Sequence, residues 1–455
     1  ELTSQWRGGH ARHAAFCDYA HETSSELEFA LDLLAARDDL PPDSPEAEAL
    51  AQSVIKDTIT HEVGHTLGLK HNFKASTVVT DAQLRDRDFV EKNGLSGSVM
   101  DYNAFNIALS GERPRALNNT TLGPYDYWAV EYAYKPIDPA LEAAELARIG
   151  ARSTEPQLAY SDDAEAGGVP GNDGIDPLVN RFDLGDDPLA YYRRRLQLSR
   201  ELWQRVQERT PQAGEDPLRQ RRVLASGFAQ LRRASELVGK YVGGMNTVRD
   251  LPGTTGRASY APVDSAKQRD ALRFLADGLF SADSFRFKPA FLTRLTPDYD
   301  DSNRGGPVSI PSNVLAVQTP VLDRLLSPGT AVRLIELPLY VDPKSAGARH
   351  LISLSEVYAT LQAAVWSELK TGQEIDGLRR NLQREHLRRV QVLLVRGVGM
   401  LPADALSLVR LHAVELQKSL QAASLRGGLS TVNRAHVLDC LSQLSESLRA
   451  TMLRS

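Results

Sequence analysis

The sequence is poor in several residues that carry specialised structure or chemistry. It holds two cysteines, Cys17 and Cys440, four methionines and ten histidines in 455 residues. Two cysteines allow at most one disulfide and exclude a scaffold built on disulfides. The chain also lacks any run of about 18 apolar residues, so the sequence predicts no transmembrane helix.

An excess of basic charge is absent too. The chain has 53 Lys and Arg against 58 Asp and Glu, for a formal net charge of −5. Because proteins that bind nucleic acid or anionic membranes present a basic face, we expect neither partner. The length of 455 residues allows two or three domains. The chain begins with Glu1 and shows no secretory signal, so the compartment is not read from the sequence alone.

Helical periodicity dominates what is present. One helix is predicted over 22–37, and a second begins at Pro45 and ends near Gly68. The second helix carries an apolar stripe that must be buried against something. The stripe consists of Leu50, Val54, Ile55, Ile59, Val63 and Leu67.

Most of the remaining chain follows the same helical period. Further helices are predicted over about 125–134, 190–210, 216–242, 264–280, 352–371, 375–398, 402–424 and 430–452. Between 297 and 345 the chain is punctuated by Pro and Gly, and "AVRLIELPLYV" predicts a short strand. The acidic, poorly hydrophobic stretch 161–188 predicts a loop or linker. We therefore expect a mainly α fold.

The scarce histidines gather in one short motif, "HEVGHTLGLKH". His61 and His65 are four residues apart, so on a helix they share one face and can bind one metal ion. Gly68 allows the left-handed turn that brings His71 to the same ion. A random match to this pattern in such a chain has odds on the order of one in 10⁴ to 10⁵. The motif predicts one Zn²⁺ ion held by His61, His65 and His71.

A second motif, "SGSVMDYNAF", follows downstream and contains Met100 and Tyr102. A zinc motif of this form followed by a Met-turn is the metzincin pattern, so the chain resembles a metzincin zinc peptidase. "SVMDY" is similar to the Ser-x-Met-x-Tyr of the astacin and serralysin branches. That resemblance implies that Met100 lies beneath the zinc ligands and that Tyr102 stabilises the tetrahedral intermediate. Asp101 is not the residue associated with either branch.

The wider chain, over about 5–450, resembles the large bacterial zinc-dependent metalloproteases with a C-terminal Met-zincin domain. The segments that carry this likeness are "HEVGHTLGLKHNFKAS", "LGPYDYWAVEYAYKP", "FDLGDDP", "YVGGM" and "PVDSAKQRDALRFL". The resemblance implies periplasmic or extracellular work on peptide or protein substrates. We expect a catalytic region with zinc helix and Met-turn over 1–150, an acidic loop or linker over 151–190, and a helical C-terminal domain over 191–455.

The residues predict a mechanism for a zinc endopeptidase. Zinc lowers the pKa of a bound water, and Glu62, beside the first ligand, serves as the general base. Zinc and Tyr102 would hold the oxyanion. Glu62 and Tyr102 are therefore the predicted catalytic residues.

Two weaker clusters allow further metal ions. His10, His13, Cys17 and His21 recur at spacings of three or four, as ligands of a second metal would; an amphipathic helix with ordinary histidines is the alternative. The acidic stretch could bind Ca²⁺ through carboxylates, although it fits no EF-hand loop and a solvated linker is the simpler interpretation. Its candidate ligands are Asp162, Asp163, Glu165, Asp173, Asp176, Asp183, Asp186 and Asp187.

One expected part of a metzincin has no counterpart in the sequence. Metzincin catalytic domains place a sheet before the zinc helix, yet no run of alternating β-formers precedes His61. We expect an upstream N-terminal region of the same protein to supply that sheet. A catalytically silent fragment that acts as a structural or protein-binding module is the alternative function.

Overall fold

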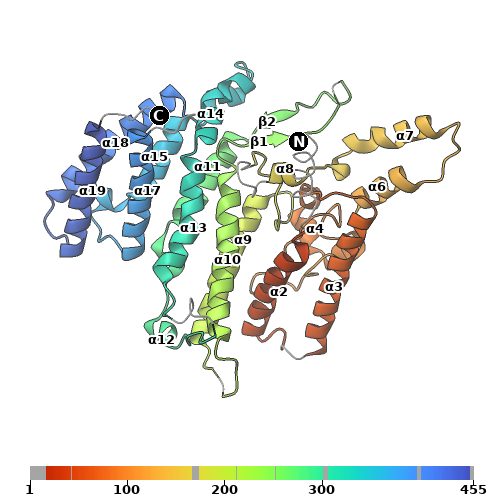
Figure 1. The fold of residues 1–455 in the computed structure, drawn as a ribbon, viewed down its shortest axis with the longest axis horizontal. Helices are drawn as coiled ribbons and strands as arrows, with labels where there is room; N and C mark the ends of the chain where they lie inside the picture. Colours follow the sequence, from red (N-terminus) through yellow and green to blue (C-terminus); the bar gives the residue numbers. More distant parts are fainter. Residues whose placement is uncertain are drawn as a thin grey trace, which may run out of the picture. The chain divides into compact units, whose positions relative to one another are not determined.

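The computed structural model describes residues 17–41, 44–166, 174–211, 213–251, 253–300, 306–396 and 401–450. Figure 1 shows a mainly helical chain, which confirms the predicted fold class. The one sheet in these ranges has two antiparallel strands, β1 (Met245–Thr247) and β2 (Tyr260–Pro262). Among the described residues, no helix has the length and hydrophobicity of a membrane span.

The chain divides into two compact units. The first contains the described residues up to Asp162 together with Arg181–Asp186. The second contains the described residues within Asp163–Asn180 and those from Asp187 onward. The acidic stretch 161–188 therefore contributes to both units. Its carboxylates are not uniformly solvated, since Asp176 and Asp183 are both fully buried.

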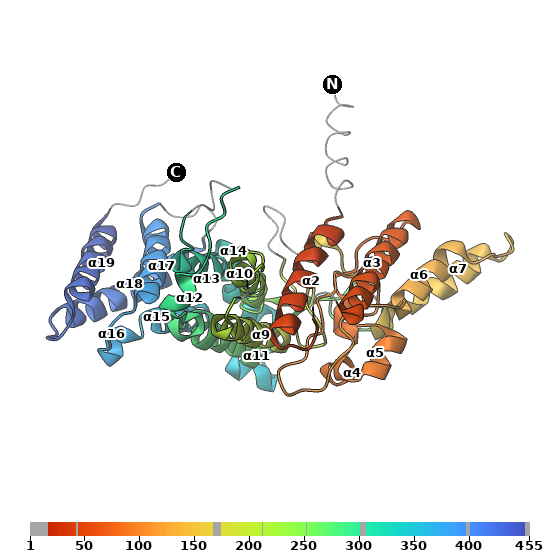
Figure 2. The same cartoon turned by 90° about the horizontal axis from the view of Figure 1, so that it is seen from below.

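The first unit is a set of helices joined by structured loops. Its elements are α2 (Tyr19–Ala36), α3 (Pro45–Thr66), η1 (Ala75–Val78), α4 (Asp81–Arg85), α5 (Arg87–Asn93), α6 (Pro124–Tyr134), α7 (Glu142–Gly150), η2 (Ala151–Thr154) and η3 (Pro156–Leu158). Helices α2 and α3 pack side by side, as Figures 1 and 2 show from two directions. Ser44 caps α3 by accepting a hydrogen bond from the Ala47 amide at 3.1 Å, and Pro45 occupies the first turn.

Helix α3 buries only part of its apolar stripe. Its buried positions recur every three or four residues and are Ala47, Leu50, Val54, Asp57, His61 and Gly64. Ile55, Ile59 and Val63 are instead 50%, 57% and 48% exposed. The described residues leave this part of the stripe uncovered, because Asp57 and His61 have hydrogen-bond partners on the inner side and hold that side inward.

The second unit consists largely of long helices. Its α-helices are α8 (Asp163–Ala166), α9 (Pro188–Glu208), α10 (Arg219–Gly239), α11 (Ser265–Phe274), α12 (Pro289–Leu292), α13 (Ile310–Leu325), α14 (Pro328–Glu336), α15 (Leu354–Val365), α16 (Glu368–Thr371), α17 (Gly377–Val395), α18 (Ala403–Ser424) and α19 (Thr431–Arg449). Shorter helical turns are η4 (Leu275–Leu279), η5 (Ala282–Phe285), η7 (Leu337–Tyr340) and η8 (Ala346–His350). Helix α10 packs against α9 and α13, and α17 packs against α13, α18 and α19 (Figure 1).

Two features of the second unit differ from the sequence prediction. The predicted strand in "AVRLIELPLYV" is wrong: these residues belong to α14 and η7. Ser327 caps α14 by accepting from the Thr330 amide at 3.2 Å, and Ala331 and Leu334, one turn apart, fill the core. The sequence analysis predicts no helix where α13 lies, because the segment 297–345 is punctuated by Pro and Gly. Pro311 instead starts the helix, and Pro320 lies within it.

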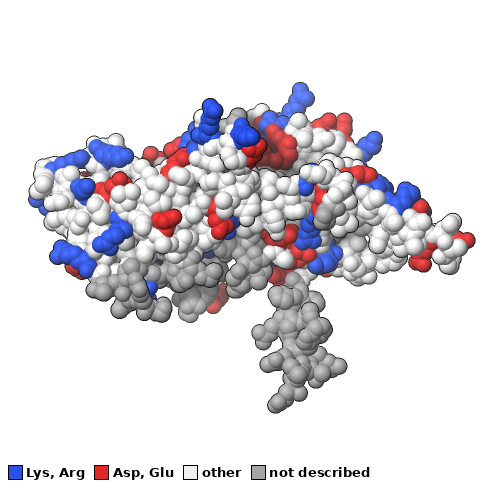
Figure 3. All heavy atoms as spheres, turned by 90° about the horizontal axis from the view of Figure 1, so that it is seen from above, with Lys and Arg blue, Asp and Glu red and all other residues white. Residues whose placement is uncertain are grey.

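Charge is well mixed on the part of the surface that can be followed in Figure 3. Lys and Arg side chains and Asp and Glu side chains are both spread over this face, with uncharged atoms between most of the groups. Neither sign forms a continuous patch on that face.

Candidate metal centre

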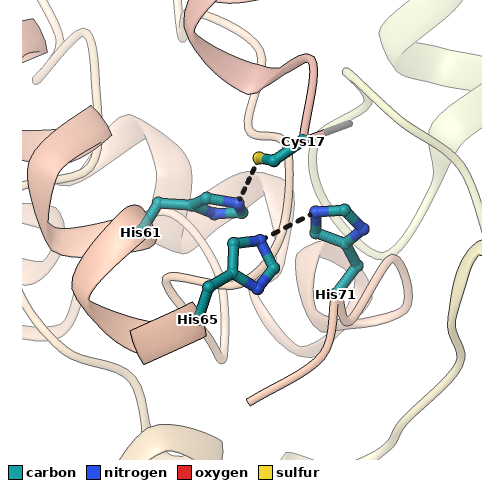
Figure 4. Close-up of side chains that lie close together, drawn as sticks. All are labelled: Cys17, His61, His65 and His71. Carbon is teal, nitrogen blue, oxygen red and sulfur yellow. Dashed lines mark hydrogen bonds between the residues drawn. The ribbon is translucent and has the colours of Figure 1, made fainter. Parts of the chain in front are cut away.

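Three histidines of the first unit converge as the motif predicts. His61 and His65 lie one turn apart on α3, and Gly68 has a φ of +86°, which turns the chain so that His71 faces them. The Nε2 atoms of His65 and His71 are 3.1 Å apart. Figure 4 shows the three rings pointing toward one another.

Backbone carbonyls orient two of the rings. His61 Nδ1 lies 2.8 Å from the carbonyl oxygen of Val99, and His65 Nδ1 lies 3.0 Å from that of Leu69. Since a carbonyl oxygen only accepts, each Nδ1 carries the hydrogen and donates. Each Nε2 is then the unprotonated nitrogen, and its lone pair faces the centre of the cluster, as in histidines that bind metal.

A cysteine that the sequence did not single out for this site completes the cluster. Cys17 precedes α2, and its Sγ lies 3.4 Å from His61 Nε2 (Figure 4). One ligand atom from each of Cys17, His61, His65 and His71 lies within 4.8 Å of the others. The sequence offers Cys17 only as a ligand of a second metal, because 44 residues separate it from His61 and no spacing rule spans that distance.

This donor set fits a zinc ion. With Zn–N near 2.0–2.1 Å and Zn–S near 2.3 Å, a tetrahedral site has N–N edges of about 3.3 Å and N–S edges of about 3.5 Å. The His65–His71 pair at 3.1 Å and the Cys17–His61 pair at 3.4 Å come close to these edges. Imidazole and thiolate are also the ligand types that zinc prefers.

Glu62 lies beside the ligands without being one of them. It follows His61 on α3, is half-buried, and its Oε1 lies 3.3 Å from Cys17 Sγ. Its carboxylate therefore lies at the edge of the cluster, next to the Cys17 sulfur.

Met100 packs directly against the zinc helix. A Cβ built on Gly64 of α3 would lie 2.2 Å from Met100 Sδ, so only glycine leaves room for the methionine. The turn that presents Met100 is held by Asp126 of α6, which accepts from Ser98 Oγ at 2.6 Å and from the Val99 amide at 2.9 Å. This contact places Met100 against α3 at Gly64, between His61 and His65 in the sequence.

Tyr102 also lies at the cluster. Its side chain is buried, its hydroxyl oxygen lies 3.3 Å from Cys17 Sγ, and its ring stacks on Tyr19 with centroids 4.7 Å apart. Tyr19 in turn donates to Asp57 of α3 at 3.1 Å. Burial of that carboxyl raises the pKa of Asp57 to about 7. These contacts hold the Tyr102 ring against the start of α2 and tie α2 to α3.

Asp101, which is not the residue associated with the astacin or serralysin branch, contributes to the packing of its turn. It is fully buried, and its carboxylate accepts from the Ser76 amide at 2.7 Å, which ties the turn to η1. Burial, with the nearby Asp183 carboxyl, holds the pKa of Asp101 well above its usual range.

The second metal site suggested by His10, His13, Cys17 and His21 is not seen among the described residues. His10 and His13 lie outside the described residues, His21 is exposed on α2, and Cys17 faces the three histidines instead of a second metal. Both cysteines are free, so no disulfide joins Cys17 to Cys440.

The acidic stretch does not form a calcium site in the part of the chain that the structure describes. There, the one cluster of three or more metal-ligating side chains is that of Cys17 and the three histidines. Asp176 instead accepts hydrogen bonds from the amide and hydroxyl of Thr247, at 2.8 and 2.9 Å. Asp173 lies outside the described residues.

A helix that carries two histidines, a glycine turn that returns a third, and a methionine packed beneath them together define a metzincin-type metal centre. A family model described as Met-zincin matches residues 43–373, and the chain belongs to that family. Membership implies a metallopeptidase that uses zinc. No curated protein and no solved structure matched the chain in the same comparisons.

Proposed function

We propose that the protein is a zinc-dependent endopeptidase whose zinc ligands are His61, His65 and His71. The observation that carries the proposal is the convergence of the three imidazoles. In His61 and His65, a hydrogen bond from Nδ1 to a backbone carbonyl oxygen directs the Nε2 lone pair inward. The Met-zincin family supports the same reaction class.

Each nearby residue has a role in this proposal. Zinc, when bound, supplies a Lewis acid that polarises the substrate carbonyl and lowers the pKa of water. The Glu62 carboxylate accepts a proton from the attacking water and delivers it to the leaving amine. The Tyr102 hydroxyl donates a hydrogen bond to the oxygen that becomes negative. Met100 and Gly64 hold the zinc helix in place.

A Glu62→Gln variant tests the proposal. Glutamine keeps the size of the side chain but cannot accept the proton, so in the full-length protein the variant should bind zinc normally and hydrolyse peptides about 10²- to 10⁴-fold more slowly. Glu46→Gln, an exposed change on the same helix, is the matched control and should leave the rate unchanged. Near-normal hydrolysis by Glu62→Gln would remove Glu62 from the mechanism.

The exposed apolar row on α3 supports a second part of the proposal. We define this row as Ile55, Ile59 and Val63, which are all about half exposed. Single exposed apolar residues are ordinary, but three along one helix face beside a candidate active site suit an interaction surface. The described residues of the first unit contain no strand that could align a peptide substrate by β-augmentation. An upstream region of the same protein that packs on this row would supply one.

The location of the protein is part of the proposal as well. A periplasmic or extracellular enzyme would agree with the exported proteins that the chain resembles. Fractionation of cells that express the full-length protein tests this, and recovery in the cytoplasm alone would contradict it.

A further inference from the structure

A thiol lies where a peptidase of this kind needs an open position. Three protein ligands leave one side of a catalytic zinc free for water or substrate, whereas four closed ligands are typical of structural or blocked sites. Cys17 Sγ lies 3.4 Å from His61 Nε2, 3.3 Å from Glu62 Oε1 and 3.3 Å from Tyr102 Oη. The sulfur therefore contacts one ligand and both proposed catalytic residues at once.

The surroundings of Cys17 hold it in that position. Tyr19, two residues later, is buried, with its ring 4.4 Å from His61 and 4.7 Å from Tyr102 between centroids. Its hydroxyl donates to Asp57, so the start of α2 is tied to α3 on the inner side. Cys17 itself is only half-buried, so it remains accessible to reagents.

We propose that the Cys17 thiolate is the fourth zinc ligand and that it keeps the peptidase latent by filling the place of the attacking water. This inference rests on the proposed zinc site. On ligation the thiol releases its proton to solvent, and a zinc–sulfur bond forms where a zinc–water bond would otherwise be. Withdrawal of Cys17, or alkylation of its sulfur, breaks the bond and opens the site to substrate, beside Glu62 and Tyr102.

The first experiment looks at the metal itself. The full chain is loaded with Co²⁺, which takes the same ligands, and its near-ultraviolet absorption is compared between Cys17→Ala and the matched control Cys440→Ala. Cys440 is the other free cysteine and lies buried in the second unit. We expect a thiolate-to-cobalt charge-transfer band in the wild type and in Cys440→Ala, and its loss in Cys17→Ala. A band that survives in Cys17→Ala, or that is absent from the wild type, would overturn the inference.

Two further readouts use zinc. The affinity of Cys17→Ala for zinc should fall about tenfold to a hundredfold. The loss is modest because a water molecule takes the place of the missing sulfur ligand. Zinc should also slow the reaction of Cys17 with an aromatic disulfide reagent at least tenfold. Unchanged affinity and unchanged thiol reactivity would each contradict ligation.

The outcomes separate this inference from the proposed function. If His65→Ala abolishes zinc binding while Cys17→Ala changes neither spectrum nor affinity, the zinc site stands and the thiol ligand is rejected. If no variant binds zinc, the proposed function itself fails. If both hold, Cys17→Ala should hydrolyse peptides at least tenfold faster than the wild type when the upstream region is present, and an equal rate would refute latency.

Discussion

Met100 Sδ occupies the space that a side chain on Gly64 would need, at 2.2 Å from the position of its Cβ. This contact joins the turn "SVMDY" to the helix that carries His61 and His65. The two motifs, read separately in the sequence, are thus one packed unit, and disturbing either should move the histidines.

Gly64→Ala should therefore weaken zinc binding. Its methyl group forces Met100 aside, and overpacking of this kind costs about 1–3 kcal/mol of stability. The better helix propensity of alanine offsets about 1 kcal/mol of that cost. We expect a small net loss of stability and zinc affinity about 10- to 100-fold lower, the range seen when groups that support metal ligands are disturbed. Calorimetric zinc titration checks this.

The matched control is Gly150→Ala at the end of α7. There the nearest atom to an added Cβ is Tyr132 Cε2 at an ordinary 3.8 Å, so zinc affinity should not change. The double variant Gly64→Ala/Met100→Ala should lose less affinity than the sum of the single changes, because the clash is gone. Strict additivity would mean that the contact does not support the ligands.

Tyr102→Phe should lower the rate of peptide hydrolysis by about 10²- to 10³-fold, the cost of losing one oxyanion donor, while zinc affinity stays near normal. The hydroxyl acts only on charge that develops in the transition state. The measurement is best made in the Cys17→Ala background with the upstream region added, where substrate has access. Tyr127→Phe, an exposed tyrosine on α6, serves as control. An unchanged rate would make Tyr102 a packing residue.

The exposed row on α3 should matter for assembly and not for the stability of this chain. Ile55→Glu and Ile59→Glu should change the free energy of unfolding by less than about 0.5 kcal/mol, as surface changes do. The same variants should no longer be stimulated by the upstream region, whereas Gln52→Glu, an exposed charge change on α3, should be stimulated normally. Loss of several kcal/mol in either Ile variant would show that the row is part of a core.

Stability of the second unit should fall in acid because of buried histidines. Trp366 Nε1 donates to His386 Nδ1 at 3.2 Å, and burial lowers the pKa of His386 to about 4. Burial also lowers the pKa of His436 to about 4. The unfolded chain, with an ordinary histidine pKa near 6.5, binds these protons first. Stability is therefore complete above about pH 6.5 and is lost as the pH falls toward 4.

For His386 alone the loss near pH 4 should be about 3 kcal/mol. Urea unfolding at pH 7 and pH 4.5, followed by circular dichroism, measures it. His386→Gln should make the pH dependence shallower, with His436 still contributing, while His350→Gln at an exposed position should leave it unaltered. The same slope in wild type and His386→Gln would contradict this assignment.

The sequence predicted the helices and the histidine cluster because both follow local rules. Helical periodicity located α2, α3, α9, α10 and α17–α19 to within a few residues, although it predicted α15 and α16 as one helix, and the glycine before His71 predicted the turn. The same rules failed for α13, because they treat a proline as the end of a helix. Helix α13 instead continues through Pro320 and packs against α10 and α17.

What the sequence could not predict depended on contacts between distant segments. The inward face of α3 is decided by Tyr19 and Val99, which bond to Asp57 and His61, and the apolar stripe gives no hint of them. Cys17 reaches the histidines only through the packing of α2 on α3. Asp176 and Asp183, in a stretch that reads as solvated, are buried for the same reason.

Zinc content of the purified chain tests the central claim most directly. Elemental analysis should give about one zinc ion per chain for the wild type and for His21→Ala, an exposed histidine of α2 that serves as control. His61→Ala, His65→Ala and His71→Ala should each lose most of that zinc while keeping the helical circular dichroism spectrum. Zinc near zero in the wild type, or equal in all five proteins, would contradict the account.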